Sequence, residues 1–491
     1  MHPLDVAVLS LYLLLILALG VWFARRGRGT RDYFRGGARM PWWAAGASLL
    51  ATWLSSLTYM GIPAKVYHTN WAYLVGALAP VLIVPLVTRC YLPFFRKLDV
   101  TSAYEYLEKR FSRSVRLLGA AMFAGFHLTR SAVLLLMPAL ALHALVDLPV
   151  TAGVLLLGLF CAAYTLLGGI EAVIWTDVLQ VIVLTGGAVA ALLVVLLGLE
   201  GGAAQVVEVG SAQGKFALAN PGWSPFEASA WVILVGYSIG MLGPYTADQT
   251  LVQRYLTTSD QRGAARAIWL GVAGYIPVAL VFYFLGTAMW VYYQANPGLL
   301  PADIAPDAVV PHFLTHQLPA GLSGLAIAGI VAAAMSTLDS SFNSIATSVV
   351  TDWLPAREGS ENDAGRMRLA RGVTLIAGLL TTLGALLAVW LAVHTGSLLD
   401  VFLMLLGITG PMAGLFALGI FTRRTNAAGA WAGTVLGTAT VLVVWQATEV
   451  SFFLYPPIGL GVSLVTGYVA SWIAAPEETD LSLTVAGLRR T

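Results

Sequence analysis

The residues best placed to do chemistry lie in residues 329–351, a mostly small and apolar stretch that is long enough to cross a bilayer. A carboxylate in hydrocarbon costs on the order of 3 kcal/mol, so we expect Asp339 to face the protein interior or water. Closely spaced oxygens that face inward suit a small hard cation such as Na⁺. The alternative is that these hydroxyls only let helices pack closely and hydrogen-bond across the contact. The polar residues fall on one face of a helix: Ser336, Asp339, Ser340, Asn343 and Thr347.

A second polar stretch interrupts the apolar run 43–66. A helix with this content near mid-membrane is predicted to be discontinuous, because unwound carbonyls are tolerated there only where they line a cavity or bind an ion. The alternative is a helix that ends at Pro63 and carries a few packing hydroxyls. The interrupting residues fall within twelve positions: Thr52, Ser55, Ser56, Thr58, Gly61 and Pro63.

Three further places carry candidate chemistry. His127 and Arg130 lie about ten residues past the start of the apolar run 117–145, hence near the middle of the membrane. Arginine keeps its charge and offers a fork of donors that matches a carboxylate, so Arg130 either pairs with a structural aspartate or binds an anionic solute, and we favour the solute. Asp177 either caps its helix or is a cation ligand. We expect Gly243 and Pro244 to break the helix of the run 228–251.

The composition identifies a polytopic all-α membrane protein. Of 491 residues, 58% are hydrophobic and 11% charged, with a mean hydropathy of +0.79. The N-terminal run follows only four residues and lacks a basic segment, so we expect a retained helix and not a signal peptide. At about 20 residues per crossing we expect thirteen spans: residues 5–24, 43–66, 71–92, 117–145, 150–167, 172–197, 228–251, 267–293, 320–351, 372–393, 399–421, 427–447 and 452–474.

The basic residues predict the orientation, because short cytoplasmic loops collect Lys and Arg. With the N-terminus outside and the C-terminus inside, 24 of the 27 Lys and Arg residues fall in inner segments, the exceptions being Lys65, Arg130 and Lys215. Topology thus accounts for the positive charge, and we expect no nucleic-acid partner. The string GYSIG matches a nucleophile elbow, but it lies in a predicted membrane helix, so we expect no enzyme. Only 17 residues follow Ala474, too few for a signalling domain, and no obligate protein partner is expected.

Two interrupted spans, the second and the seventh, lie five spans apart and cross in opposite directions. Interruptions at corresponding positions of two inverted halves are typical of secondary transporters. Spans 2 to 6 and 7 to 11 are therefore the predicted repeats. The predicted segments are an additional helix with a basic inner loop in 1–42, the first repeat with the start of the second in 43–251, the second repeat in 228–421, and two additional helices with a short tail in 422–491.

Several long motifs resemble those of the sodium:solute symporter family, in the right order over nearly the whole chain: DYFRGG, PWWAAGASLLATWLSS, GGIEAVIWTDVLQ, DQTLVQRYL and AAAMSTLDSSFNS. PAKVY, YLPFFRKLDVTSAYEYLEKRF and GPMAGLFALGIF resemble the bacterial sialic acid branch of that family. The resemblance implies a LeuT-type core of ten helices in the inner membrane and Na⁺-coupled symport, by alternating access, of a carboxylate-bearing solute such as sialic acid. A monocarboxylate, a neutral sugar, and a transporter-like receptor without transport are the alternatives.

The resemblance also implies ligands. For a first Na⁺ they are the carbonyls of Ala51, Leu54 and Ala333 and the hydroxyls of Ser336 and Thr337. For a second Na⁺ they are Asp177, Ser340 and Asp339, the last standing where the branch is expected to have serine, so that it either strengthens the site or takes a proton. For the solute they are Ser55, Thr58, Tyr73, Ala77 and Arg130. Ala77 replaces an expected glutamine and Trp53 an expected threonine, which argues against assuming sialic acid itself.

Overall fold

The computed structural model describes residues 2–25, 29–218, 222–301, 303–304, 308–354, 363–395, 398–474 and 480–488 of the chain. Within these residues the secondary structure is helical, apart from one isolated bridge between Met40 and Thr258. The helices are α1 (Pro3–Ala24), α2 (Thr30–Arg35), α3 (Trp42–Trp53), α4 (Ser56–His68), α5 (Ala79–Leu86), α6 (Leu92–Lys97), α7 (Glu105–Arg110), α8 (Arg113–Val146), α9 (Val150–Leu197), α10 (Gly202–Ala212), α11 (Ala230–Ala247), α12 (Gln249–Leu256), α13 (Gln261–Ala295), α14 (Val309–His316), α15 (Leu322–Ser348), α16 (Asp363–Thr395), α17 (Leu398–Phe421), α18 (Ala427–Ala447), α19 (Tyr455–Ile473) and α20 (Val485–Leu488).

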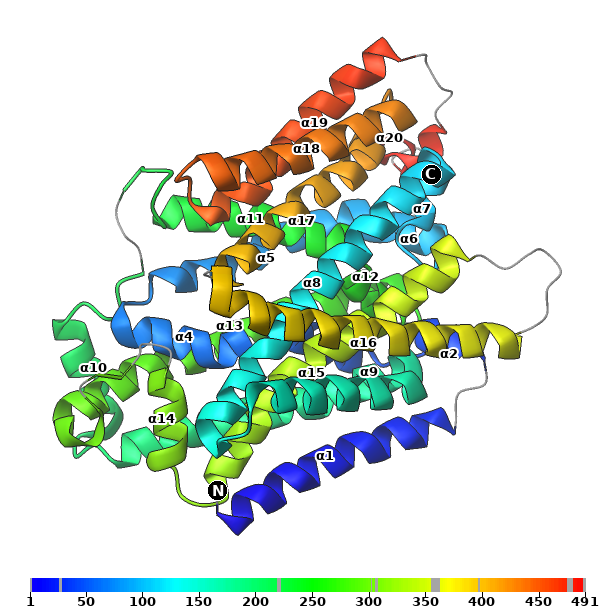
Figure 1. Cartoon of the computed structure of the whole chain (residues 1–491). Coiled ribbons are helices and arrows are strands. Elements are labelled where there is room, and N and C mark those ends of the chain that lie inside the picture. Colours follow the sequence, from blue (N-terminus) through cyan, green and yellow to red (C-terminus); the bar gives the residue numbers. More distant parts are fainter. Residues whose placement is uncertain are drawn as a thin grey trace.

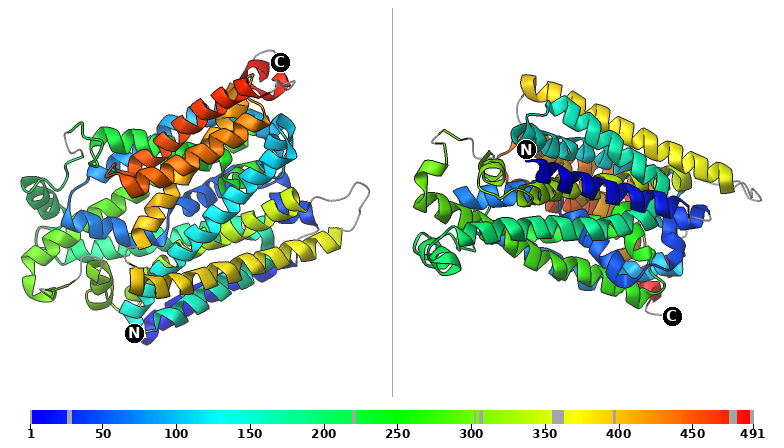
Figure 2. Two further views of the ribbon diagram at one scale, coloured as in Figure 1. Left: turned by 45° about the horizontal axis from the view of Figure 1, so that its top comes forward. Right: turned by 90° about the horizontal axis from the view of Figure 1, so that it is seen from below.

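The long helices lie roughly side by side in one bundle, with α10 and α14 at one end and α6 and α7 at the other (Figure 1). The N-terminus and the C-terminus lie toward opposite ends of this bundle in both further views (Figure 2). Hydrogen bonds attach each terminal segment to its end of the bundle. Near the N-terminus, Asp5 accepts from the Gly321 N–H just before α15, and near the C-terminus, the Leu483 carbonyl accepts from Tyr106 of α7. Eleven helical stretches of the described chain are long and apolar enough to cross a bilayer, so this is a multi-pass membrane protein.

The expected break in the second span is confirmed. Helix α3 ends at Trp53, Leu54 and Ser55 have extended backbone conformations, and α4 begins at Ser56. The Ser55 hydroxyl caps α4 by accepting from the Thr58 N–H. Each half is too short to be counted as a membrane span by itself, so this span is not among the eleven.

Helix α9 is one continuous element where the sequence predicted two separate spans. Its 48 residues would extend about 72 Å if straight, more than twice the thickness of a bilayer core. The chain instead turns at Gly169, where φ is 63° and an added Cβ would lie 2.8 Å from the Tyr33 carbonyl oxygen. In the first half, Cys161 contacts the Met335 carbonyl and Tyr164 contacts Asp339. In the second half, Asp177 lies near Ser340 through Arg254 and Gly187 faces Leu325, so the two halves run in opposite directions along α15. The predicted spans 150–167 and 172–197 correspond to these two halves.

The expected break at Gly243 and Pro244 is wrong in position. Helix α11 continues through both residues to Ala247, and the chain leaves the helical conformation at Asp248. An added Cβ at Gly243 would lie 2.5 Å from the Thr409 carbonyl oxygen, so this glycine allows α11 to approach α17 closely. Asp248 starts α12 because its carboxylate accepts the Thr250 N–H at 2.8 Å.

Helix α15 lies at the centre of the molecule and is buried along almost its whole length. It packs against both halves of the broken second span, the two halves of α9, and helices α1, α8, α12 and α16. The predicted polar stripe of α15, from Ser336 to Thr347, is at most 1% exposed, so it faces protein and not lipid. This burial confirms that Asp339 faces the interior.

Candidate functional site

The end of α3 and the middle of α15 meet in a cluster of oxygens. The Ser336 hydroxyl lies 3.2 Å from the Ala51 carbonyl oxygen and 3.1 Å from the Ala333 carbonyl oxygen, and the Thr337 hydroxyl lies 3.4 Å from the latter. Leu54 follows the last residue of α3 with ψ near 90°, which takes its carbonyl out of the helical ladder. These are the five residues expected to bind the first Na⁺. They hold more acceptor positions than protons, which is the pattern that a small cation complements.

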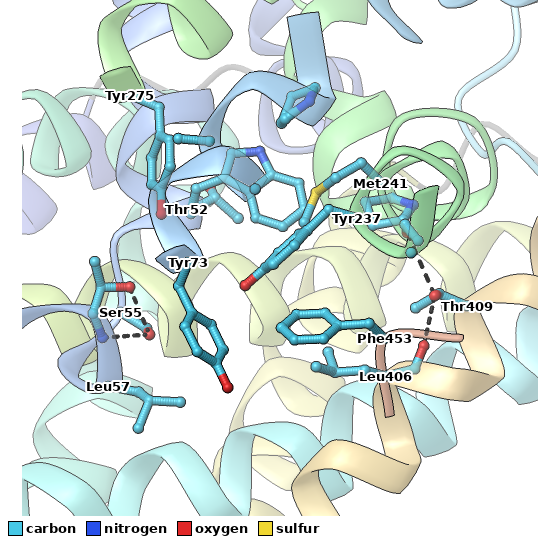
Figure 3. Close-up of a pocket in the computed structure, with 18 of the residues that line it drawn as sticks. Thr52, Ser55, Leu57, Tyr73, Tyr237, Met241, Tyr275, Leu406, Thr409 and Phe453 are labelled. Atoms are coloured by element: carbon cyan, nitrogen blue, oxygen red, sulfur yellow. Dashed lines mark hydrogen bonds between the residues drawn. The ribbon is translucent and has the colours of Figure 1, made fainter. Parts of the chain in front are cut away.

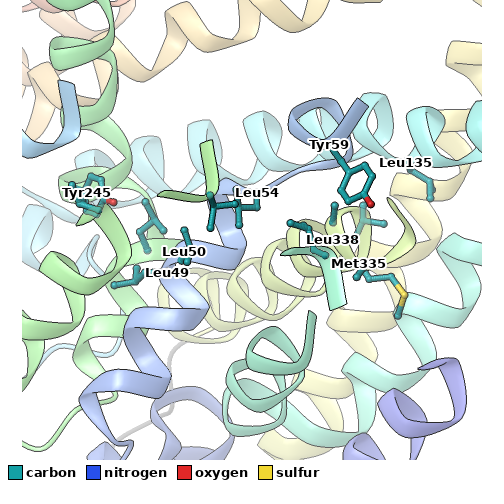
Figure 4. Close-up of a cluster of buried hydrophobic side chains, with 14 of the residues drawn as sticks. Leu49, Leu50, Leu54, Tyr59, Leu135, Tyr245, Met335 and Leu338 are labelled. Atoms are coloured by element: carbon teal, nitrogen blue, oxygen red, sulfur yellow. The ribbon is translucent and has the colours of Figure 1, made fainter. Parts of the chain in front are cut away.

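Apolar side chains surround this junction (Figure 4). Leu50 and Leu54 come from the end of α3, and Leu338 and Met335 from α15, all at most 7% exposed. They keep water away from the oxygens, and in such a low-dielectric setting the attraction between carbonyl dipoles and an ion is stronger than in water.

A second polar cluster lies one turn further along α15. The Asp177 carboxylate oxygen Oδ2 accepts from the Ser48 hydroxyl and, at 3.1 Å, from Arg254. The same guanidinium also donates to the Ser340 hydroxyl and the Thr250 carbonyl oxygen. The structure thus brings Asp177 and Ser340 together, with Arg254 bonded to both. The other Asp177 oxygen, Oδ1, is buried without a hydrogen-bond partner in the described part of the chain.

Asp339 lies next to this cluster. Its carboxylate accepts from the Tyr164 hydroxyl at 2.6 Å and from the Ser340 hydroxyl at 3.3 Å, and it forms no ion pair with a described residue. Among the residues that the structure describes, Arg254 is paired with Asp177 alone, and Asp339 lies next to it through the shared contact with the Ser340 hydroxyl, which leaves room for one more monovalent positive charge if both carboxylates are ionised. Sequence reasoning placed Arg254 near the inner surface, but it is fully buried. No local pattern reveals this, because its partner Asp177 lies 77 residues away.

The five residues expected to bind solute line one cavity of about 520 Å³ beside the broken second span. Ser55 and Thr58 come from the start of α4, Tyr73 and Ala77 from the 3₁₀ helix η2 (Ala72–Leu78), and Arg130 from α8. Figure 3 shows the side chains of Tyr73 and Phe453 in the wall of this cavity, where their ring centroids lie 5.6 Å apart. The volume lies within the range of about 300–1,000 Å³ that is usual for small-molecule sites.

Arg130 is the notable charge in this cavity. It makes no hydrogen bond or ion pair with any residue that the structure describes. A guanidinium inside a bundle normally has an anionic partner, so its position in the cavity wall suits an anion brought by the solute. Asp248 lines the same cavity, but its ion pair is with His127, and it forms no hydrogen bond or ion pair with Arg130.

Several aromatic side chains form part of the remaining wall. Tyr237, Tyr275 and Phe453 line the cavity, and the Trp53 indole N–H donates to the Tyr245 hydroxyl at 2.9 Å. The indole thus fills the place where a threonine was expected. Aromatic faces favour apolar flanks of a solute, with the few polar groups fixing its orientation.

Sequence reasoning did not assign a role to His127 and Asp248, which also line the cavity. His127 Nε2 lies 2.8 Å from the Asp248 carboxylate, and Nδ1 lies 2.9 Å from the Ser341 hydroxyl. The depth of His127 in the run 117–145 marked it as unusual, but its partners lie 121 and 214 residues away in the chain.

Comparison with known proteins agrees with this geometry. The model of the sodium:solute symporter family matches residues 33–437. The sodium/sialic acid symporter NanT of Aliivibrio fischeri is 40% identical over 95% of this chain and 93% of its own, and the sodium/sialic acid symporter SiaT of Proteus mirabilis is 37% identical over 98% and 97%. A solved structure of a substrate-bound, outward-open Na⁺-coupled sialic acid symporter superposes with a TM-score of 0.90 at 36% identity, covering 97% of this chain and 99% of that one. The chain belongs to the sodium:solute symporter family.

Proposed function

We propose that this protein is a Na⁺-coupled symporter that carries a small organic anion of the sialic acid class across the inner membrane by alternating access. The unpartnered guanidinium of Arg130 in the cavity wall carries this proposal. The first residues of α4 line the same cavity, and the positive end of the helix dipole there adds a second attraction for a carboxylate. The relatives named above, which are sialic acid symporters, support the choice of solute.

The first Na⁺ is proposed to bind between Ala51, Leu54, Ala333, Ser336 and Thr337. Bound there, the ion joins the end of α3 to α15 and holds the Leu54–Ser55 junction in place. Because Ser55 lies in the cavity wall, this junction is shared by the ion and the solute. Each ligand then lowers the free energy of binding the other, which is the reciprocal coupling that a symporter needs.

A second Na⁺ is proposed to bind at Asp177, Asp339 and Ser340. The unpartnered Oδ1 of Asp177 and the excess of carboxylates over guanidinium support it. Two Na⁺ with one monovalent anion carry one net charge, so an inside-negative potential should accelerate uptake. Asp339→Asn should abolish this acceleration, whereas Asp147→Asn, an exposed aspartate, should not. If the rate of uptake by the unmodified protein does not depend on the membrane potential, the proposal of a second Na⁺ is contradicted.

The proposed architecture has thirteen spans, with the N-terminus outside, the C-terminus inside, and inverted repeats formed by spans 2 to 6 and 7 to 11. The eleven spans counted above, the broken pair of α3 and α4, and the division of α9 at Gly169 support this number. The proposed segments are 1–42, 43–251, 228–421 and 422–491. Cysteine labelling from either side of the membrane tests the orientation.

Uptake by proteoliposomes tests the function. With Na⁺ outside, we expect concentrative uptake of sialic acid, and a panel with monocarboxylates and neutral sugars identifies the preferred solute. Ser336→Ala and Thr337→Ala should abolish the dependence on Na⁺, while Ser323→Ala on the same helix serves as the control. Solute binding without any uptake would instead indicate a receptor, and normal Na⁺ dependence in both alanine variants would refute the ion site.

A further inference from the structure

His127 joins three helices at the floor of the solute cavity. Its ring belongs to α8, is 1% exposed, and contacts Asp248 at the start of α12 and Ser341 on α15. Phe123 and Phe126 pack against the ring, with centroids 4.5 and 5.2 Å from it. The ring is therefore held in one orientation by packing, and both of its nitrogens are engaged.

The first partner of His127, Asp248, lies in the wall of the cavity. Asp248 and Thr250 both line the cavity, and Nε2 of His127 lies 2.8 Å from the Asp248 carboxylate and 3.3 Å from the Thr250 hydroxyl. Since a carboxylate only accepts, Nε2 is the donor. Asp248 stands where the seventh span is interrupted, between the end of α11 and the start of α12.

The second partner of His127, Ser341, lies on α15, the helix that carries the proposed ion ligands. The Ser341 hydroxyl lies 2.9 Å from Nδ1 of His127 and 2.8 Å from the Thr337 carbonyl oxygen, and its single proton is donated to one of these two atoms at a time. Thr337 is a proposed ligand of the first Na⁺, and Ser340, the neighbour of Ser341, is a proposed ligand of the second. A continuous line of polar contacts thus runs from Asp248 in the cavity wall through His127 to Ser341 on α15.

Arg130 connects the proposed solute site to these contacts. It lies three residues after His127, on the same face of α8, and both line the cavity. We propose that His127 is a positioning residue that couples solute binding to Na⁺ binding, by tying Asp248 at the interrupted seventh span to Ser341 on the ion helix. The inference rests on the proposed function and explains how two separate sites influence each other.

The experiment measures coupling directly. The Na⁺ concentration for half-maximal binding is determined for the purified protein with and without saturating sialic acid, and sialic acid affinity with and without Na⁺. Coupling should change each value by about 5 to 150-fold in the unmodified protein. In His127→Gln and Ser341→Ala this ratio should fall toward one, although each ligand alone still binds. His143→Gln, the same substitution at an exposed position of α8, should keep the full ratio.

The double variant separates coupling from a general structural effect. If both residues act through one contact, His127→Gln with Ser341→Ala should lose no more coupling than either single variant. If His127 had only a structural role, its replacement would weaken the affinities for Na⁺ and for sialic acid but leave the effect of each ligand on the affinity for the other unchanged. That result would overturn the proposal. Unaltered coupling in the single variants would overturn it as well. An unmodified protein whose solute binding ignores Na⁺ would instead refute the proposed function, and this inference with it.

Discussion

Replacing Arg130 with glutamine is expected to remove most of the preference for an acidic solute. The guanidinium has no partner among the described residues, so its removal breaks no internal hydrogen bond or ion pair, and the melting temperature should stay nearly unchanged. A charged hydrogen-bonded pair with a solute carboxylate in a half-buried wall contributes about 3 kcal/mol. At 1.4 kcal/mol per tenfold, the affinity should fall about 150-fold.

The assay compares sialic acid with its uncharged methyl ester. The unmodified protein should prefer the acid strongly, and Arg130→Gln should bind both within a few fold of each other, chiefly because the acid loses affinity. Arg113→Gln, at an exposed position near the start of the same helix, controls for the loss of one positive charge. The reasoning is refuted if Arg130→Gln weakens both solutes equally, or if the acid keeps its affinity.

The remaining predictions concern stability. Arg254→Gln leaves Asp177 as a buried unpaired charge and should destabilise the protein by about 3–5 kcal/mol, seen as a large drop in melting temperature in detergent. The double variant Arg254→Gln with Asp177→Asn should recover part of the lost stability. If it recovers none, the ion pair between Arg254 and Asp177 is not the cause of the loss. Gly410→Ala places a Cβ 2.1 Å from the Pro456 carbonyl oxygen between α17 and α19, and overpacking of this kind costs about 1–3 kcal/mol. Gly372→Ala, which meets nothing within 4 Å, should be neutral or slightly stabilising, so equal effects of the two alanines would contradict the packing argument.

Patterns within one helix were readable from the sequence. The polar face of α15 follows from helical spacing, and the interruption of the second span follows from the density of hydroxyls, glycine and proline between Thr52 and Pro63. Both features are local, and both are confirmed. The break in the seventh span was placed too early, because glycine and proline mark a close helix approach as readily as a break when neighbouring helices satisfy the backbone.

Contacts between distant segments were not readable. The pairing of Arg254 with Asp177 and the bonds of His127 to Asp248 and Ser341 join residues 77 to 214 positions apart. Hydropathy treats an arginine near a span end as a loop residue, since it holds no information about a carboxylate on another helix. Arg130 and Ser336 were singled out by residue type and position, and the other solute residues and first ion ligands came from a resemblance. The five solute residues line one cavity, and Ser336 contacts the carbonyls of Ala51 and Ala333.

The tight turn at Gly169 has a practical consequence for experiments on motion. Two long helices that meet without a loop form a hairpin, which offers a reference for measuring the movements that the proposed alternating access requires. A spectroscopic label at the exposed Ile182 of this hairpin, paired with one at His68 at the end of α4, would report opening and closing as a change in one distance.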